Sequence, residues 1–367
     1  MRRCCFVLAI AIALLAGVCL AQLALTAGPY KATKTKVGGE GGTDYIYADA
    51  DARRLYIART GKDTPRVTVF NLDTLAPEPD IPGTNAHGVV VSNKSSHGFV
   101  SSKPIQMFDS KTLMPIKTID VMGNPDGMLY DAFNDHVYVL SHQAPHVTVI
   151  NAADGAVLGT IDLGGMPEQA ASDGKGHIYI DVEDKANIAV VDAKTMMVTA
   201  HYDLTGSGGT CAGLAMDAKN NILFAACRMP ANMVIYNILF AACRMPANMV
   251  ILSATDGKII TTLPINGGTD GALFNPNTME AFSSHGDGTL VVIKESSPTS
   301  FAVEQVVQTM TGARTSTLDS KTNRVITMAS ETAPPPPPAP GAPAPGGRGG
   351  GRGQVVPGSF SIVVVGK

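Results

Sequence analysis

An internal repeat is the feature that most constrains how this chain can fold. The repeated block opens with a small or turn residue and, in most copies, a polar residue. An apolar run follows, and Asp, Asn or Ser stands five positions after the second residue. Seven copies occur, at residues 43–49, 86–92, 125–131, 167–173, 211–217, 269–275 and 313–319. A repeat that runs through the whole chain implies that every unit forms the same supersecondary structure.

The copies are evenly spaced with one exception. Their second residues are 39 to 44 positions apart, but 58 positions separate Ala212 from Asp270. This interval contains an exact duplication, because NILFAACRMPANMVI spans 221–235 and again 237–251, joined by Tyr236. Without the sixteen added residues the interval is 42. Either one copy loops out of its unit or the unit gains extra strands, and the sequence leaves both paths open.

Each unit contains four short strands. In the third unit the strand-like runs lie at 127–130, 136–140, 146–151 and 157–163. Turn residues separate them, such as Asn134-Asp135 and Asp154-Gly155, which favour hairpins. Helical periodicity is nowhere sustained. Four-stranded units with a period near forty residues predict an all-β fold, a seven-bladed β-propeller with four-stranded antiparallel blades.

The two ends of the repeat predict how the ring closes. The seventh unit offers three strands, at 315–318, 324–328 and 359–365, whereas YKATKTKV at 30–37 is similar to outer strands such as 116–121. We therefore expect one propeller domain over 28–367, whose last blade is completed by the N-terminal strand so that no edge stays open. Residues 333–353 are rich in Pro and Gly, which predicts a disordered surface loop.

Residues 1–27 are typical of a secretory signal peptide. Arg2 and Arg3 precede an apolar run at 6–15, and small residues follow at Ala21 and Ala27, where cleavage is expected. The run is too short to predict a membrane span, so the mature chain is expected to be periplasmic or secreted, without a transmembrane segment. Its net charge is about −5, because 26 Lys and Arg remain against 31 Asp and Glu. An acidic chain without a basic stripe disfavours nucleic acid as the main partner.

The second residue of each block identifies the candidate site. The inner strands of a propeller surround a central channel, so residues at their leading ends converge on one mouth. These residues are Asp44, His87, Asp126, Glu168, Ala212, Asp270 and Arg314. The four carboxylates repel one another at close range unless a partner neutralises them. Either a hard divalent cation such as Ca²⁺ or Mg²⁺ binds the oxygens of Asp44, Asp126, Glu168 and Asp270, or Arg314 and backbone amides pair with them as part of the structure.

Two further histidines are placed to flank the same mouth, since His142 and His285 end or follow second strands. A single histidine in such a place is more often a surface or hydrogen-bonded residue than part of a site. No nucleophile elbow, phosphate-binding loop or c-type haem motif occurs in the chain. No catalytic residue is therefore assigned from the sequence.

Three cysteines remain once the leader is removed. Cys211 and Cys227 lie symmetrically about a predicted turn at Lys219, so they face each other on an antiparallel pair and are predicted to form a disulfide. The duplication supplies Cys243 as a rival partner. One thiol is left over in either pairing.

Segments of the chain resemble the YncE-like, YVTN-repeat β-propellers of bacteria. They are GGTDYIYADADARRLYIAR, AHGVVVS, NPDGMLYD, GGMPEQAASDGKGHIYIDVEDK, CAGLAMDAKNNILFAACR, SSHGDGTLVV and GARTSTLD. The resemblance covers nearly the whole mature chain and implies an extracytoplasmic binding propeller, with single-stranded DNA binding in some members. Thr43 stands where relatives often carry tryptophan, and the chain has no tryptophan. Stacking of bases on an aromatic side chain is therefore not expected at this position.

Three functions follow from these observations. The first is an exported, non-catalytic binding or scaffolding propeller, monomeric, that recognises a protein, a glycan or a small ligand at the channel mouth. The second is a metal-assisted hydrolase or lactonase that uses the acidic ring, by analogy with other propellers. The third is binding of single-stranded DNA, as in some relatives. The sequence favours the first.

Overall fold

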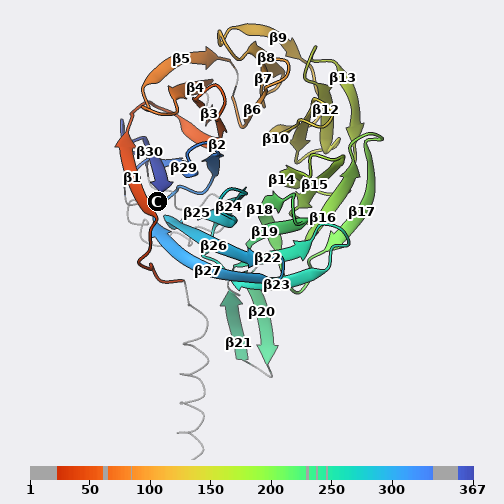
Figure 1. Cartoon of the computed structure of the whole chain (residues 1–367), viewed down its shortest axis with the longest axis vertical. Helices are drawn as coiled ribbons and strands as arrows, with labels where there is room; N and C mark the ends of the chain where they lie inside the picture. The colour runs from red at the N-terminus through yellow and green to blue at the C-terminus, as the bar shows by residue number, and fades with distance from the viewer. Residues whose placement is uncertain are drawn as a thin grey trace, which may run out of the picture.

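Seven blades surround a central axis in the computed structural model (Figure 1). The structure describes residues 23–60, 65–83, 85–228, 231–236, 239–244, 247–333 and 354–367. All secondary structure in these ranges is β, and a helix able to span a lipid bilayer is not found in this part of the chain. The predicted all-β, seven-bladed propeller with four-stranded antiparallel blades is confirmed. Most of the predicted leader (1–22) and of the predicted loop (334–353) lies outside the described residues.

The first four blades take their strands in chain order from the inside outward. They are formed by β2 (Gly42–Asp49), β3 (Arg54–Thr60), β4 (Arg66–Asn71) and β5 (Pro77–Pro82); β6 (Val89–Ser92), β7 (His97–Val100), β8 (Ile105–Asp109) and β9 (Pro115–Ile119); β10 (Pro125–Asp131), β11 (His136–Ser141), β12 (Val147–Asn151) and β13 (Val157–Ile161); and β14 (Pro167–Ser172), β15 (His177–Val182), β16 (Asn187–Asp192) and β17 (Met197–Asp203).

The last three blades depart from chain order at two points. Blade five skips two strands, and blade seven takes its outer strand from the N-terminus. Their strands are β18 (Thr210–Asp217), β19 (Ile222–Arg228), β22 (Asn248–Ser253) and β23 (Ile259–Pro264); β24 (Thr269–Asn275), β25 (Glu280–His285), β26 (Thr289–Ser297) and β27 (Ser300–Gln308); and β28 (Ser316–Asp319), β29 (Arg324–Ala329), β30 (Ser361–Gly366) and β1 (Lys31–Lys36).

The ring closes through the pairing of β1 with β30. The two strands run antiparallel in unbroken register, from Lys31 opposite Gly366 to Lys36 opposite Ser361. Figure 1 shows the red N-terminal strand beside the blue C-terminal one. Blade seven therefore has four strands, and the edge of β30 is covered, which removes a template for unwanted strand pairing.

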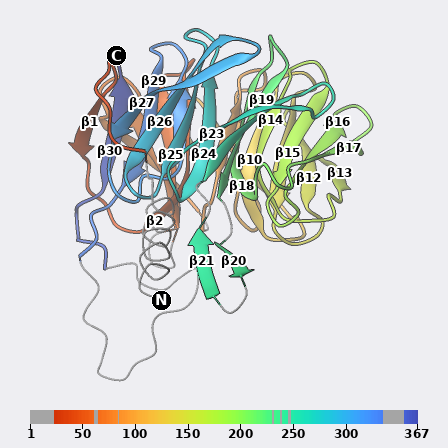
Figure 2. The same cartoon turned by 90° about the horizontal axis from the view of Figure 1, so that it is seen from below.

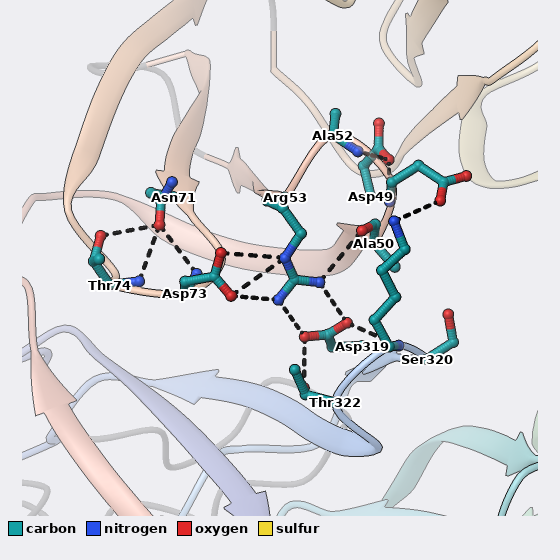
Figure 3. Close-up of polar contacts among 12 residues, drawn as sticks. Asp49, Ala50, Ala52, Arg53, Asn71, Asp73, Thr74, Asp319, Ser320 and Thr322 are labelled. Atoms are coloured by element: carbon teal, nitrogen blue, oxygen red, sulfur yellow. Dashed lines mark hydrogen bonds and ion pairs between the residues drawn. The ribbon is translucent and has the colours of Figure 1, made fainter.

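A buried ion pair reinforces the same seam (Figure 3). Arg53, in the turn between β2 and β3, donates two hydrogen bonds to the carboxylate of Asp319 at the end of β28, at 2.8 and 2.7 Å. The same guanidinium binds Asp73 within blade one at 2.6 Å. Only 2% of the Asp319 side chain is exposed. Arg53 thus joins the first blade to the last at the point where the ring could open.

The hydrophobic core consists of seven clusters, each packed between two neighbouring blades. Tyr56 and Phe108, for example, pack between blades one and two. Leu140 and Ile180 pack between blades three and four. Every blade is therefore apolar on both faces, and the blades stabilise one another around the closed ring.

The last residue of the repeated block ends the inner strand and caps the turn that follows. The side-chain oxygen accepts a hydrogen bond from the backbone amide two residues later in six blades, at Asp49, Asp131, Asp173, Asp217, Asn275 and Asp319. In blade two, Ser92 accepts from the amide of Ser95. Asp, Asn and Ser form such turns readily, so the repeat marks where each inner strand reverses.

A glycine often follows the second residue of the block because neighbouring inner strands approach closely there. A Cβ atom on Gly127 would lie 3.0 Å from the carbonyl oxygen of Glu168. A Cβ atom on Gly213 would lie 2.6 Å from the backbone nitrogen of Ala272. The absence of a side chain at these positions therefore lets the inner strands close around the channel.

The duplicated segment loops out of blade five. The first copy supplies β19 and the second supplies most of β22, and these two strands pair directly, with Cys227 opposite Asn248. The surplus forms a separate hairpin of β20 (Ala231–Tyr236) and β21 (Leu239–Arg244), which pairs with no other described strand. Both views show the hairpin projecting from the ring of blades (Figures 1 and 2). Blade five gains no extra strand from the described residues, and the looped-out hairpin combines the end of the first copy with the start of the second.

Deleting residues 229–244 should leave the propeller intact. The deletion joins Arg228 to Met245 and restores the single-copy sequence CRMPAN between β19 and β22. Because it removes no blade strand, the free energy of unfolding should change by less than about 0.5 kcal/mol. Urea unfolding of both proteins measures this. A loss of several kcal/mol would mean that the hairpin stabilises the body of the propeller.

Cys211 and Cys227 form the predicted disulfide. The two residues lie opposite each other in β18 and β19, and both are buried. Cys243, the predicted rival partner, lies in β21, whose side chains are outside the described part of the chain. The disulfide therefore ties the inner strand of blade five to its neighbour.

Candidate functional site

A charged cavity lies at the mouth of the central channel, where the inner strands begin. Its volume is about 620 Å³. Its walls come from six of the seven blades, and the lining residues are Asp44, Asp126, His142, Glu168, Glu183, Thr210, Arg228, Gly268, Asp270 and Arg314. His87, from blade two, lines a smaller adjoining pocket and contacts Asp44. The structure thus gathers all the polar residues that the repeat predicts for the mouth.

β-bulges place most of these side chains. The pairing of the inner strand with the second strand is irregular next to Asp44, Asp126, Glu168, Ala212 and Asp270. A bulge breaks the alternation of a strand and redirects a side chain. The polar residue near the start of each of these strands therefore leaves the regular pattern of the blade, which lets it face the channel.

Acidic and imidazole groups alternate along one side of the cavity. His87 Nδ1 lies 2.7 Å from Asp44 Oδ2 and 3.6 Å from Asp126 Oδ1. His142 Nε2 lies 3.4 Å from Asp126 Oδ2 and 3.0 Å from Glu168 Oε2. The row Asp44, His87, Asp126, His142, Glu168, which we call the histidine–carboxylate row, therefore crosses four blades without a break.

Two arginines occupy the other side of the cavity. Arg314 Nε lies 2.7 Å from Asp270 Oδ2, and Arg228 forms an ion pair with the other oxygen of Asp270. Arg228 also lies 3.5 Å from Glu168 Oε1 and 3.8 Å from Glu183 Oε2. Asp270 is thus held between two guanidinium groups. Of the four carboxylates predicted to bind a cation, Asp44, Asp126 and Glu168 come together, whereas Asp270 pairs with arginine.

Three members of the row, His87, Asp126 and His142, have shifted pKa values. The hydrogen bond from His142 to Glu168 raises the pKa of His142 to about 9. The hydrogen bond to Asp44 likewise raises the pKa of His87. Burial, followed by repulsion from Asp44 and Glu168, raises the pKa of Asp126 to about 6. The charge states of His87, Asp126 and His142 therefore depend on their neighbours.

Some cavity residues are absent from the sequence prediction. Arg228 ends β19, and Glu183 directly follows β15. These are the same places in their blades as His142, which follows β11 and does line the cavity as expected. Residues at or just after the ends of second strands could therefore have been predicted from the sequence to line the cavity. In blade five, Ala212 is fully buried, and Arg228 and Thr210 supply the polar lining.

His285 does not line the cavity. Its side chain is fully buried, and Nε2 lies 2.9 Å from Ser283 Oγ in the same strand. Burial lowers the pKa of His285 to about 4, so the imidazole is neutral at ordinary pH. Of the two flanking histidines expected from the sequence, only His142 reaches the mouth.

Solved structures of very different sequence share this architecture. A chain in the crystal structure of a mitotic checkpoint complex is 12% identical, with a TM-score of 0.66 over 84% of this chain and 90% of that one. The RRP9 WD40 repeats are 9% identical, with a TM-score of 0.66 over 91% and 97%. Hydrazine synthase of Kuenenia stuttgartiensis is 14% identical, with a TM-score of 0.63 over 80% and 94%. The shared feature is the propeller fold. No family model and no curated protein sequence matches the chain.

Proposed function

We propose that this chain is an exported, non-catalytic binding propeller that takes its ligand at the channel mouth. The charged cavity carries this proposal, since ligand sites are concave and bring a few polar groups together from separate elements. Six blades contribute to one cavity of about 620 Å³.

The charges of the cavity suggest the chemistry of the ligand. Arg228 and Arg314 offer guanidinium groups, which bind carboxylates in a fixed geometry. Asp126 and Glu168, a short distance away, accept hydrogen bonds from ammonium or hydroxyl groups. A peptide segment, a sugar acid or a small zwitterion meets both requirements. The carboxylates repel phosphate groups, so nucleic acid is the least favoured of the ligands considered.

The fold and the sequence support a recognition role outside the cytoplasm. The similar solved structures include WD40 repeats and a chain of a multiprotein complex, which is compatible with scaffolding or protein recognition. We also propose membership of the YncE-like, YVTN-repeat family, on the strength of the sequence segments alone. The leader-like N-terminus supports export to the periplasm or beyond.

The contacts of the N-terminal segment predict where the leader is removed. The Leu23 amide donates to Asn266 at 2.8 Å, and Thr26 exchanges hydrogen bonds with Val306 at 3.2 and 2.9 Å. Cleavage after Ala27 would discard these contacts, whereas cleavage after Ala21 keeps them. We therefore expect the secreted protein to begin at Gln22, which intact-mass spectrometry measures. A mass that corresponds to a start at Gly28 would contradict this expectation.

The binding proposal is tested with a panel of amino acids, dipeptides, uronic acids and neutral sugars. Thermal-shift hits are titrated by calorimetry into the wild type, Arg314→Ala and Lys321→Ala. Arg314 lines the cavity, whereas Lys321 forms an exposed ion pair with Asp51. A charged ligand should lose at least about tenfold in affinity in Arg314→Ala, the cost of about one charge-assisted hydrogen bond, and nothing in Lys321→Ala. Equal losses in both variants, or in neither, would contradict binding at the mouth.

A further inference from the structure

The histidine–carboxylate row has the composition of a metal centre. Its donor atoms form two adjacent groups: Asp44, His87 and Asp126 make one, and Asp126, His142 and Glu168 make the other. Within each group one ligand atom per residue lies within 4.8 Å of the others. Asp126 belongs to both groups and presents one oxygen to each histidine. We propose that the row binds divalent transition-metal ions, with Asp126 as the ligand shared between two adjoining positions.

The spacing of the donors suits metal coordination. Ligand atoms about 2.1 Å from one metal ion are separated by about 3.0 Å at right angles and about 3.4 Å in a tetrahedron. The imidazole–carboxylate separations in the row are 2.7, 3.0, 3.4 and 3.6 Å. Within each group, the imidazole–carboxylate separations are therefore close to those around a single ion.

Asp126 provides the second reason to place a cation here. Its side chain is only 17% exposed, and in the described part of the chain its contacts to His87 and His142, at 3.6 and 3.4 Å, are longer than good hydrogen bonds. In Asp270, by comparison, each carboxylate oxygen forms an ion pair with an arginine. A largely buried carboxylate without a strong hydrogen bond is costly, and a metal ion removes this cost.

The donor set indicates a transition metal. Imidazole nitrogen suits Zn²⁺, Fe²⁺, Ni²⁺ and Cu²⁺, and mixed imidazole and carboxylate sets also suit Mn²⁺ and Co²⁺. Ca²⁺ and Mg²⁺ prefer sites made only of oxygen. The proposed set keeps three of the four carboxylates predicted to bind Ca²⁺ or Mg²⁺, Asp44, Asp126 and Glu168, and adds His87 and His142.

A second contact supports the orientation of His87. The side-chain nitrogen Nδ2 of Asn85 lies 3.2 Å from Nε2, the nitrogen that points away from Asp44. Rotation of the amide by 180° would place its oxygen at this contact, where it would accept the Nε2 proton and leave Nδ1 free to bind metal. Ligating histidines usually have such a partner on the second nitrogen.

The proposal uses the same cavity as the proposed binding function but is tested separately. The mature protein is stripped with a chelator, and Zn²⁺, Mn²⁺, Co²⁺, Ca²⁺ and Mg²⁺ are titrated by calorimetry. Bound metal per chain is counted after gel filtration, and the visible absorption of Co²⁺ reports the ligand geometry. The variants are Asp126→Asn, which keeps the shape of the side chain, and His142→Gln. The control is His177→Gln, because His177 forms a similar pair with Asp173 but lies outside the cavity.

We expect Zn²⁺, Co²⁺ or Mn²⁺ to bind more tightly than Ca²⁺ and Mg²⁺. Affinity should fall at least about tenfold in Asp126→Asn and in His142→Gln, since loss of even an outer partner of a metal site costs this much, and it should be unchanged in His177→Gln. No binding by the wild type, equal binding by all variants, or a preference for Ca²⁺ or Mg²⁺ would overturn the proposal. Thermal unfolding of the metal-free variants separates loss of metal from loss of fold.

The two proposals fail in different ways. If metal binds and the organic panel does not, the metal site stands and the proposed ligand function falls. If an organic ligand binds through Arg314 to metal-free protein that takes up no metal, the reverse holds. Organic binding that requires the metal would join the two proposals in one site.

Discussion

Replacing Arg53 by alanine is expected to destabilise the propeller by about 3 kcal/mol. The substitution leaves the Asp319 carboxylate, whose side chain is 2% exposed, without its cationic partner. Removing one member of a buried ion pair costs several kcal/mol, because the remaining charge stays buried and unpaired. The loss falls at the junction of blades one and seven, where the ring must stay closed (Figure 3).

Urea unfolding of Arg53→Ala and Lys321→Ala measures the effect with a matched control. Lys321 pairs with Asp51 in the same region, but both side chains are more than half exposed, at 52% and 67%. Exposed pairs contribute less than about 1 kcal/mol, so Lys321→Ala should be nearly neutral. Similar stabilities of the two variants would show that the Arg53–Asp319 pair does not hold the seam.

The Arg53 effect should also depend on pH. Burial works to raise the pKa of Asp319, but hydrogen bonds from Arg53 and Thr322 outweigh it and hold the pKa below its usual value of 3.8. A carboxyl group with a lowered folded-state pKa stabilises the protein above its unfolded-state pKa and loses that contribution as the pH falls. The difference between the wild type and Arg53→Ala should therefore be full at neutral pH and shrink below about pH 4.

Removing the Cys211–Cys227 disulfide is the second large effect. The double variant Cys211→Ala, Cys227→Ala should lose about 3 kcal/mol, the value for a closed loop of about 15 residues. The bond joins β18 to β19 beside Thr210 and Arg228, which line the cavity. Reduction should therefore loosen the mouth as well as the blade.

Unfolding with and without reductant, together with non-reducing peptide mapping, tests this expectation. The hairpin-deleted protein is a useful background, because it lacks Cys243 and can form only one bond in the mature chain. The wild type and the deletion protein should lose the same free energy on reduction. A Cys211–Cys243 or Cys227–Cys243 peptide as the main species would contradict the pairing in the structure.

The repeat predicts the fold because its recurring residue types each meet a local structural requirement. The terminal Asp, Asn or Ser caps a turn, and the glycine after the second residue permits close approach of the inner strands. Both effects depend on a few neighbouring atoms, so they are visible in sequence. The seven interblade clusters then follow from the even spacing of the strands.

The site was only partly predictable, because its details depend on contacts between blades. The positions of Asp126 and Glu168 follow from the repeat, but the pairing of Asp270 with Arg228 requires the end of β19 to reach blade six. His285 lies opposite Thr269 as Ser141 lies opposite Pro125, so His142 stands one position further along its blade than His285. His142 lines the cavity and His285 is buried. The pairing register decides this difference, because a shift of one residue along a strand turns a side chain to the opposite face. The path of the duplicated segment likewise depends on which of the two identical copies supplies each strand of blade five.

The most direct test of the channel mouth as the binding site is a crystal structure with the tightest ligand from the panel. We expect density in the cavity between Asp126 and Arg314, in contact with at least one of Arg228 and Arg314. Density on the rim or on the opposite face of the ring, with the cavity filled only by solvent, would contradict binding at the mouth.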